Sequence, residues 1–311
     1  MKYTGDVFEK FGRGKYSRVD AQHKLNFFYG RNSEGNASLL LQTACKVETL
    51  PSTNSITVET GWRERDRMWT ISFNLKQAEL MNIFVCFCED IVESSRDIEC
   101  GQVGVQFVEN RYLEWRHLLS AGKSDYLSLS AIKGLLGEMK FCLDVLVPAC
   151  GAEKAVLSWQ GPLKKNQDFA FENTWYEIKT VSPGSVDVAI SSIEQLGNPI
   201  QGHLVVQTAE TTTLTSSVGI TLNEAFEQLD ELMKEHPQTR RTMRGNLVSL
   251  GYVPVSYYDQ FKFVFYDRWS YRVDGQFPAL RRNRLPAAVS EAKYRLLLSL
   301  LDDFKEYREF Q

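Results

Sequence analysis

An aspartate and a Glu-x-Lys triplet stand nine residues apart in the stretch QDFAFENTWYEIKT, as Asp168 and Glu177-Ile178-Lys179. Side chains alternate across a β-strand, so a strand over residues 174–180 places Glu177 and Lys179 on one face. A turn through residues 172–173 can bring Asp168 back beside them. The pattern therefore predicts one rigid element that holds two carboxylates and an ammonium group together.

These side chains have the chemistry of a metal-assisted site. Carboxylate oxygens are hard ligands that suit Mg²⁺ or Mn²⁺, so Asp168 and Glu177 are candidate metal ligands. Lys179 is the candidate for a group that handles a proton or faces a phosphate. A plainer interpretation stays open, in which Glu177 and Lys179 form an exposed ion pair on the strand.

A third acid, Glu138, stands in a predicted helix over residues 130–147. We expect Ser128 or Ser130 to cap this helix and Pro148 to terminate it. The residues three and four positions away from Glu138 are uncharged, so its carboxylate lies on a side that should pack inward. A buried carboxylate needs a partner. It is a third acid aimed at the metal, a helix-boundary position shared with the exposed Lys133 and Lys140, or one partner of a salt bridge.

The order of the predicted elements indicates an α/β (α+β) fold in three parts. Residues 1–122 form an N-terminal β-rich unit, with strands near 24–29, 37–42, 55–60 and 68–75 and helices near 74–94 and 105–119. Residues 123–215 form the core, with strands near 155–159, 174–180, 186–190 and 203–208 and a short helix at 193–196. Residues 216–311 form a C-terminal α/β extension, with helices near 222–235 and 287–307 and strands near 261–266 and 269–273.

Charge is unevenly distributed along the 311-residue chain. Residues 236–295 hold eleven Lys and Arg against four Asp and Glu, a net +7, which leaves −10 for the rest of a chain whose total is −3. This segment also interleaves its basic residues with aromatic ones, a mixture that suits nucleic acid. We expect phosphate contacts from a set of lysines and arginines: Lys164, Lys165, Arg240, Arg241, Arg244, Arg281, Arg282 and Arg284.

Neither a secretory signal nor a membrane span is expected. The first residues, MKYTGDVFEK, lack an apolar signal region, and the apolar run at residues 83–88 is far short of a membrane span. We therefore expect a soluble, cytoplasmic protein.

The helical Glu138, then Asp168, then the strand with Glu177 and Lys179, followed by a strand and a helix, resembles the PD-(D/E)XK nuclease superfamily. More narrowly, the stretches GLLGEMKF, SWQGPLKKNQDFAF and WYEIKT resemble an uncharacterised bacterial PD-(D/E)XK branch whose members tend to be encoded in phage-defence gene clusters. The first motif of the superfamily is often Pro-Asp, whereas Gln167 precedes Asp168 here.

The resemblance implies a restriction-endonuclease-like core, a mixed central sheet flanked by helices, and a Mg²⁺-dependent DNA endonuclease in which Mn²⁺ can replace Mg²⁺. Glu138, Asp168 and Glu177 would be the metal ligands, and Lys179 would orient the attacking water or stabilise the phosphate. Gln195 matches a helical polar residue near the site. DNA would be the substrate. ATPase or methyltransferase subunits and a second copy of the chain are the partners that the resemblance suggests.

Two other functions stay open. One is a non-catalytic subunit that keeps a nuclease fold and binds nucleic acid or assembles a defence complex. The other is a different Mg²⁺ enzyme that acts on phosphoesters or nucleotides.

Overall fold

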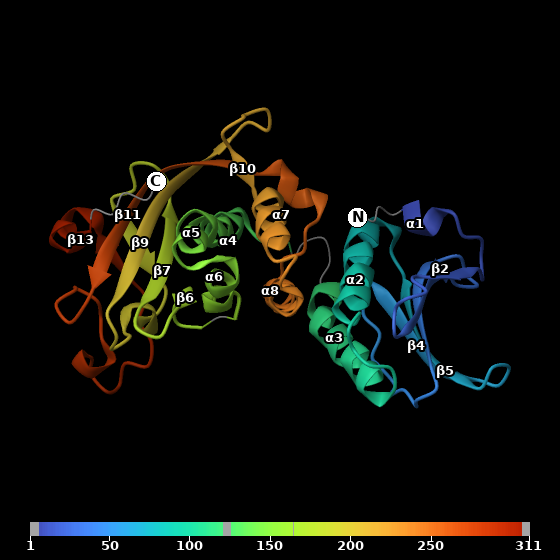
Figure 1. Ribbon diagram of the computed structural model, residues 1–311. Helices are drawn as coiled ribbons and strands as arrows, with labels where there is room; N and C mark the ends of the chain where they lie inside the picture. Colours follow the sequence, from blue (N-terminus) through green and yellow to red (C-terminus); the bar gives the residue numbers. More distant parts are fainter. Residues whose placement is uncertain (1–5, 121–125, 164, 307–311) are drawn as a thin grey trace. The chain divides into compact units, whose positions relative to one another are not determined.

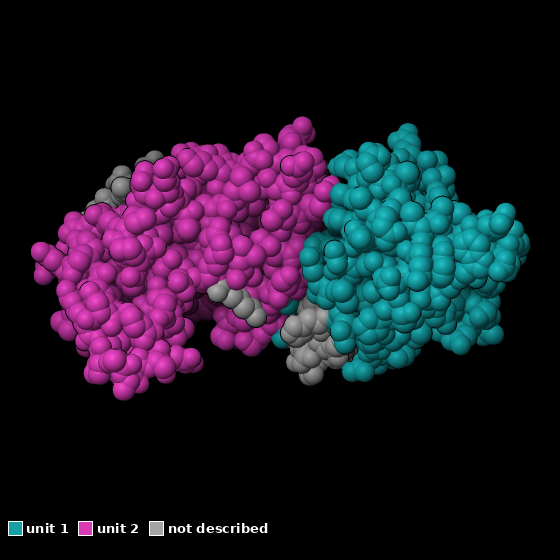
Figure 2. Space-filling view, turned by 90° about the horizontal axis from the view of Figure 1, so that it is seen from below, with its two compact units in different colours: residues 1–126, 251–253 teal, residues 127–250, 254–311 magenta. Residues whose placement is uncertain are grey.

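The computed structural model describes residues 6–120, 126–163 and 165–306. The chain divides into two compact units (Figure 2), one of residues 1–126 with 251–253 and the other of residues 127–250 with 254–311. The three-part division at residues 122 and 215 stays a prediction. No helix in the described ranges is long and apolar enough to cross a membrane.

Unit 1 is a five-stranded antiparallel sheet with helices on one face (Figure 1). The sheet order is β1 (Tyr16–Arg18), β2 (Asn26–Arg31), β3 (Ala37–Thr43), β5 (Met68–Leu75) and β4 (Ile56–Arg63). The short helix α1 (Asp6–Glu9) precedes the sheet, and η1 (Ala78–Leu80), α2 (Met81–Ser94) and α3 (Gln102–Ser120) follow it. Phe73 of the sheet contacts the rings of Phe87 and Tyr112, which joins the two helices to the core. The four strands predicted here are confirmed.

The predicted helix over residues 74–94 begins later than expected. Residues up to Leu75 complete β5, and α2 starts at Met81 after the 3-10 turn η1. The segment up to Leu75 is a strand because Asn74 pairs with Thr57 of β4 and Ser38 of β3. Sheet pairing on both sides outweighs the helical spacing of the apolar residues.

Unit 2 is built on a mixed sheet, which confirms the predicted fold class. Its order is β10 (Ile220–Thr221), β11 (Lys262–Val273), β9 (Gly202–Thr212), β7 (Trp175–Val181) and β6 (Phe169–Ala170), and β13 (Lys305–Glu306) also pairs with β11. The pair β7 and β9 is parallel, and the other neighbouring pairs are antiparallel. A separate two-stranded sheet joins β8 (Asp187–Ile190) to β12 (Tyr294–Leu297).

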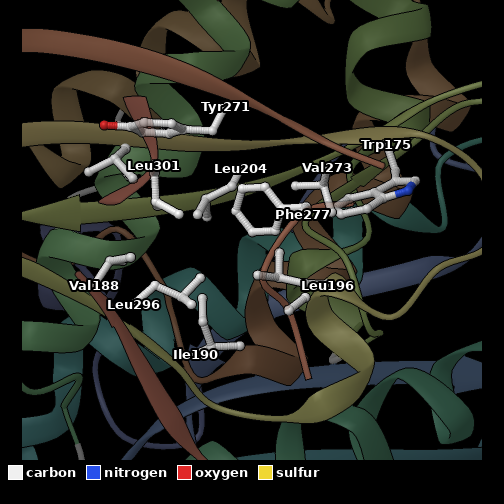
Figure 3. Packing of buried hydrophobic residues seen from close by; sticks show 12 residues of the cluster. Trp175, Val188, Ile190, Leu196, Leu204, Tyr271, Val273, Phe277, Leu296 and Leu301 are labelled. Atoms are coloured by element: carbon white, nitrogen blue, oxygen red, sulfur yellow. The ribbon is translucent and has the colours of Figure 1, made fainter. Parts of the chain in front are cut away.

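The two faces of the mixed sheet are covered differently. On one face lie α4 (Leu129–Phe141), the π-helical turn η3 (Cys142–Leu146), α5 (Val147–Cys150) and α6 (Ala152–Ser158) (Figure 1). On the other face a buried apolar cluster joins β7, β9 and β11 to β8 and β12 (Figure 3). Trp175 lies in this cluster and is 1% exposed. It shares one face of β7 with Glu177 and Lys179, so that face is buried in the core at the start of the strand.

Two elements differ from the predictions in the stretch around the site. Residues 155–159 lie in the helix α6 and its C-terminal cap, not in a strand, because Gly151 restarts the chain at φ +84° ahead of the helix formers AEKA. Pro148 does not end the preceding helix. It stands in the first turn of α5, where its missing N–H is tolerated, and the helix ends at Gly151 instead.

The C-terminal part holds the largest error. The predicted helix over residues 287–307 is absent from the described residues up to 306; they hold β12, two 3-10 turns η8 (Leu298–Leu300) and η9 (Asp302–Phe304), and β13. Its leucine-rich sequence favours a helix, but Leu296 and Leu301 are buried in the cluster and β12 pairs with β8. Tertiary packing overrides the local propensity. Tyr307 lies outside the described residues.

Other elements complete unit 2. The helix expected near residues 222–235 is α7 (Leu222–Leu232), with a capping box between Thr221 and Glu224. The next helix, α8 (Pro237–Leu250), was not among the predicted elements. The two strands expected at 261–266 and 269–273 are the single strand β11, which is interrupted by an irregularity between Phe265 and Arg268. The 3-10 turns η4 (Gly161–Leu163), η5 (Ile193–Leu196), η6 (Ser256–Gln260) and η7 (Arg282–Arg284) link the larger elements.

Candidate active site

Strand β7 carries two of the candidate residues side by side. The carboxylate Oε1 of Glu177 lies 2.8 Å from Nζ of Lys179, and the Glu177 side chain is 1% exposed. A surface ion pair would be solvated on both partners. The interpretation of Glu177 and Lys179 as an exposed pair is therefore wrong.

Asp168 is fixed at the open edge of β7. Its Oδ2 accepts a 2.7 Å hydrogen bond from the backbone N–H of Ile178, between Glu177 and Lys179. Its backbone carbonyl accepts from the N–H groups of Gln160 and Gly161, at 2.6 and 3.0 Å. Asp168 thus joins the Glu-x-Lys strand to the loop after α6.

Glu138 reaches the same place from helix α4. A Cβ built on Gly161 would lie 2.2 Å from Oε2 of Glu138 and 3.2 Å from Oδ1 of Asp168, so both carboxylates approach the same glycine. The indole Nε1 of Trp159 donates to Oε2 of Glu138 at 2.7 Å. In the described part of the chain Glu138 forms no ion pair, so the salt-bridge interpretation of this residue finds no support.

Gln195 completes the group on the Lys179 side. It lies in η5, where its Oε1 accepts from Nζ of Lys179 at 3.3 Å and from the backbone N–H of Ser191 at 2.8 Å. Gln167, the residue that stands where the superfamily often has proline, donates from Nε2 to the backbone carbonyls of Glu194 and Gln195. It therefore holds η5 against the segment that carries Asp168.

The site concentrates charge in a place that is shielded from water. Burial raises the pKa of the Glu138 and Glu177 carboxyls well above their usual value, and the charge of Asp168 adds to both shifts. Burial also raises the pKa of Asp168 to about 6, although the N–H of Ile178 and the charge of Lys179 oppose it. Burial lowers the pKa of Lys179, but the three acids outweigh burial and leave that pKa above its usual value.

The donor set fits a divalent cation in its chemistry. Both carboxylate oxygens of Glu177 are buried and accept no hydrogen bond, which is costly for an anion unless a cation satisfies them. The Lys179 ammonium forms an ion pair with Glu177, but the geometry of this contact is not that of a hydrogen bond. Across the described residues, however, no three acid, histidine or cysteine side chains are placed as a ready ligand group. The carboxylates would have to rotate to share one ion.

An open cleft of about 710 Å³ has Lys179 in its wall. Lys133 of α4 and Arg295 of β12 also line it, together with hydroxyl groups such as that of Ser182. Lys133 donates to Ser182 at 3.1 Å, and Arg295 pairs with Asp187. Neither basic residue was among the predicted phosphate contacts, although Lys133 stands only five residues before Glu138 on the same helix.

The predicted phosphate contacts are distributed over several elements. Arg240 and Arg244 of α8 both pair with Asp230. Arg281 donates to the carbonyl of Asp274, and Arg282 pairs with Glu194, next to Gln195. Lys165 and Arg284 are exposed, Arg241 is half-buried on α8, and Lys164 lies outside the described residues.

The sequence pattern did not assign Trp159 and Gly161 to the acids, although both lie between the helix of Glu138 and the segment of Asp168. No spacing rule links them to either acid. The one available signal is the Trp-Gln-Gly-Pro stretch ahead of Asp168. There a glycine permits a close approach that a side chain would block.

Comparison with known proteins identifies one family. A family model described as "Putative PD-(D/E)XK family member, (DUF4420)" matches residues 9–299. Comparisons with curated proteins and with solved structures gave no significant match.

Proposed function

This chain belongs to the DUF4420 family, whose description places it among the PD-(D/E)XK proteins, and from that premise we propose that it is a metal-dependent DNA endonuclease. It hydrolyses phosphodiester bonds with Mg²⁺, for which Mn²⁺ can substitute. We further propose that it acts in a bacterial restriction or anti-phage defence system.

One observation carries the proposal: four charged groups from three segments of the chain lie together at the edge of β7. Glu138 and Asp168 approach Gly161, and Glu177 contacts Lys179 at 2.8 Å. An acid cluster with a single lysine, next to an open cleft, suits a substrate that is itself an anion and needs a cation to approach.

Asp168 and Glu177 would hold the metal, and Glu138 would be the third ligand. The metal, when bound, supplies Lewis-acid stabilisation of the phosphate and a more acidic water. Lys179 holds a full positive charge beside the acids and can orient the attacking water or face the scissile phosphate. Gln195 restrains the Lys179 ammonium by accepting from it.

The nucleic acid would be held by basic groups around the site. Lys133 and Arg295 line the cleft beside Lys179 and are placed to meet backbone phosphates. The contacts predicted from the sequence are proposed as well: Lys164, Lys165, Arg240, Arg241, Arg244, Arg281, Arg282 and Arg284. ATPase or methyltransferase subunits and a second copy of this chain are proposed partners.

The test is incubation of the pure protein with modified and unmodified plasmid in Mg²⁺ or Mn²⁺. We expect nicking or cleavage that Asp168→Ala and Lys179→Ala each abolish while DNA binding persists. Asp66→Ala, an exposed acid in unit 1, is the control and should cleave as the wild type does. Unchanged cleavage by Asp168→Ala would remove the site assignment.

The absence of a ready three-ligand group among the described residues favours a second candidate. In that case the chain is a non-catalytic subunit that binds nucleic acid or assembles a defence complex. DNA binding without any cleavage, in every divalent metal and in the presence of the proposed partners, would select it.

A further inference from the structure

A small pocket lies beside Gly161, because the residues before and after this glycine line it. It is formed by α6, η4 and α8 and has a volume of about 90 Å³. A single water needs about 10–15 Å³ of such space, so the pocket has room for several waters or one flat heterocycle. It is not part of the cleft that Lys179 lines.

The lining of the pocket also contacts the acid cluster. Trp159 lines the pocket and donates its indole N–H to Glu138. Gln160 and Pro162 line it too, and between them stands Gly161, which both carboxylates approach. A group in the pocket would therefore lie next to a phosphate that is bound at the acids. A nucleobase lies in the same way next to the phosphate of its own nucleotide.

The lining is apolar with a few amide groups. Pro162 and Met243 are buried apolar residues of the wall, and the exposed Leu157, 57% exposed, adds an apolar surface at the rim. The side-chain oxygen of Gln160 is buried and accepts no hydrogen bond, while its Nε2 is held by the carbonyl of Leu157. Asn246 of α8 adds a second amide.

These features match one class of ligand. A flat ring needs apolar walls for its faces, and its edge needs hydrogen-bonding groups such as amides. The amide of Asn246, which lines the pocket, can hydrogen-bond to a base edge. A base within a stacked duplex could not enter a slot between helices, so the occupant must be unpaired or extruded.

We propose that the pocket between α6, η4 and α8 receives one unpaired nucleobase of the strand whose phosphate lies at the acid cluster. This proposal rests on the proposed function for the position of the phosphate. It adds a subsite that reads a base beside Glu138 and is separate from the cleft that Lys133 and Arg295 line.

The test compares two fluorescent single-stranded oligonucleotides of equal length in EDTA, one with bases and one with abasic sites throughout. Both carry the same phosphates, so the difference in their affinities measures base contacts. We expect the wild type to bind the oligonucleotide with bases about fivefold or more tightly. Thr242→Phe, at an exposed position of α8 that lines the pocket, should bring that difference within about twofold by filling the space.

Ser249→Phe is the matched control, an exposed residue of the same helix that does not line the pocket. Ser249→Phe should keep the wild-type difference in affinity between the two oligonucleotides. Asn246→Ala, a truncation that leaves the helix intact, should reduce the difference without adding bulk. A thermal melt shows that each variant is folded.

Plasmid cleavage in Mg²⁺, run in parallel, separates this proposal from the proposed function. If the wild type cleaves but folded Thr242→Phe and Asn246→Ala keep the full difference, the pocket does not hold a base and the function stands. The opposite result is that Thr242→Phe and Asn246→Ala lose the difference in affinity although the wild type never cleaves. That result would support the base pocket and contradict the nuclease assignment. Equal affinity of the wild type for both oligonucleotides overturns the pocket.

Discussion

Trp159 Nε1 donates a 2.7 Å hydrogen bond to Oε2 of Glu138, which couples the loop after α6 to the acid on α4. This bond favours the ionised carboxyl and opposes the rise in the pKa of Glu138 that burial and Asp168 cause. Trp159→Phe keeps a ring against Phe169 but removes the donor. We expect its pH–rate profile to shift its acidic limb to higher pH and its cleavage rate near neutrality to fall. Trp62→Phe, an exposed tryptophan of unit 1, should leave the profile unchanged.

Gly161 offers a steric test of the site. An alanine Cβ at this position would lie 2.2 Å from the Glu138 carboxylate, so Gly161→Ala must displace that acid. We expect at least a tenfold loss of cleavage. Gly134→Ala on α4 is the matched change, since no atom lies within 4 Å of its added methyl. It should stabilise the protein by about 0.5–1 kcal/mol in a thermal melt and keep full activity. Equal activity of the two variants would show that the contact at Gly161 is unimportant.

Asp168 makes the metal-free protein less stable at neutral pH. Its pKa is about 6 in the folded protein against an ordinary value of 3.8, so the folded state disfavours the ionised form. Stability should therefore fall as pH rises from about 4 through 6, by an upper bound of about 3 kcal/mol. Asp168→Asn, which can still accept from the N–H of Ile178, should reduce this fall and raise the melting temperature at pH 8 but not at pH 4.

The same variant tests metal binding without measuring catalysis. Mg²⁺ should raise the melting temperature of the wild type at pH 8, because a ligand that binds only the folded state stabilises it. It should not raise that of Asp168→Asn. An equal response of both proteins would mean that the ion binds elsewhere.

How far the sequence could predict this site depends on the range of the interactions. The alternation along β7 is local, so the position of Glu177 beside Lys179 follows from the period of a strand. Glu138 could be selected because a charge among apolar helix neighbours conflicts with burial. The contact of Glu138 with Gly161 and Trp159 depends on how α4 and the loop after α6 pack, and no spacing in the sequence encodes it.

The fold errors have the same origin. Residues 287–306 are rich in helix formers, yet the pairing of β12 with β8 and the burial of Leu301 decide their structure. Residues 155–159 hold valine and tryptophan, which favour strands, but the turn at Gly151 starts a helix there. In both places a distant partner or a single backbone angle outweighs the local preference.

Lys133 is the cleft residue with the most specific prediction. Burial lowers its pKa, with Glu210 opposing, and its ammonium donates to Ser182 in the wall of the cleft. If it meets a phosphate, Lys133→Ala should weaken DNA binding and reduce the slope of log affinity against log salt by about 1. Lys234→Ala, an exposed lysine just after α7 that pairs with Glu231 of that helix, should leave the slope unchanged.

Asp230 holds Arg240 and Arg244 and so connects α7 with α8. Burial raises the pKa of Asp230, but the two arginines outweigh it and bring that pKa to about 2. Because the folded pKa is depressed, the stabilisation is present above about pH 4 and is lost as pH falls toward 2. Asp230→Asn should therefore lower the melting temperature at pH 7 and have less effect near pH 2. A second variant tests whether Arg240 and Arg244 also contact phosphates. If they do, Arg240→Ala must change both the salt dependence of DNA binding and the melting temperature. A change in stability with an unaltered salt slope would assign that arginine to the fold.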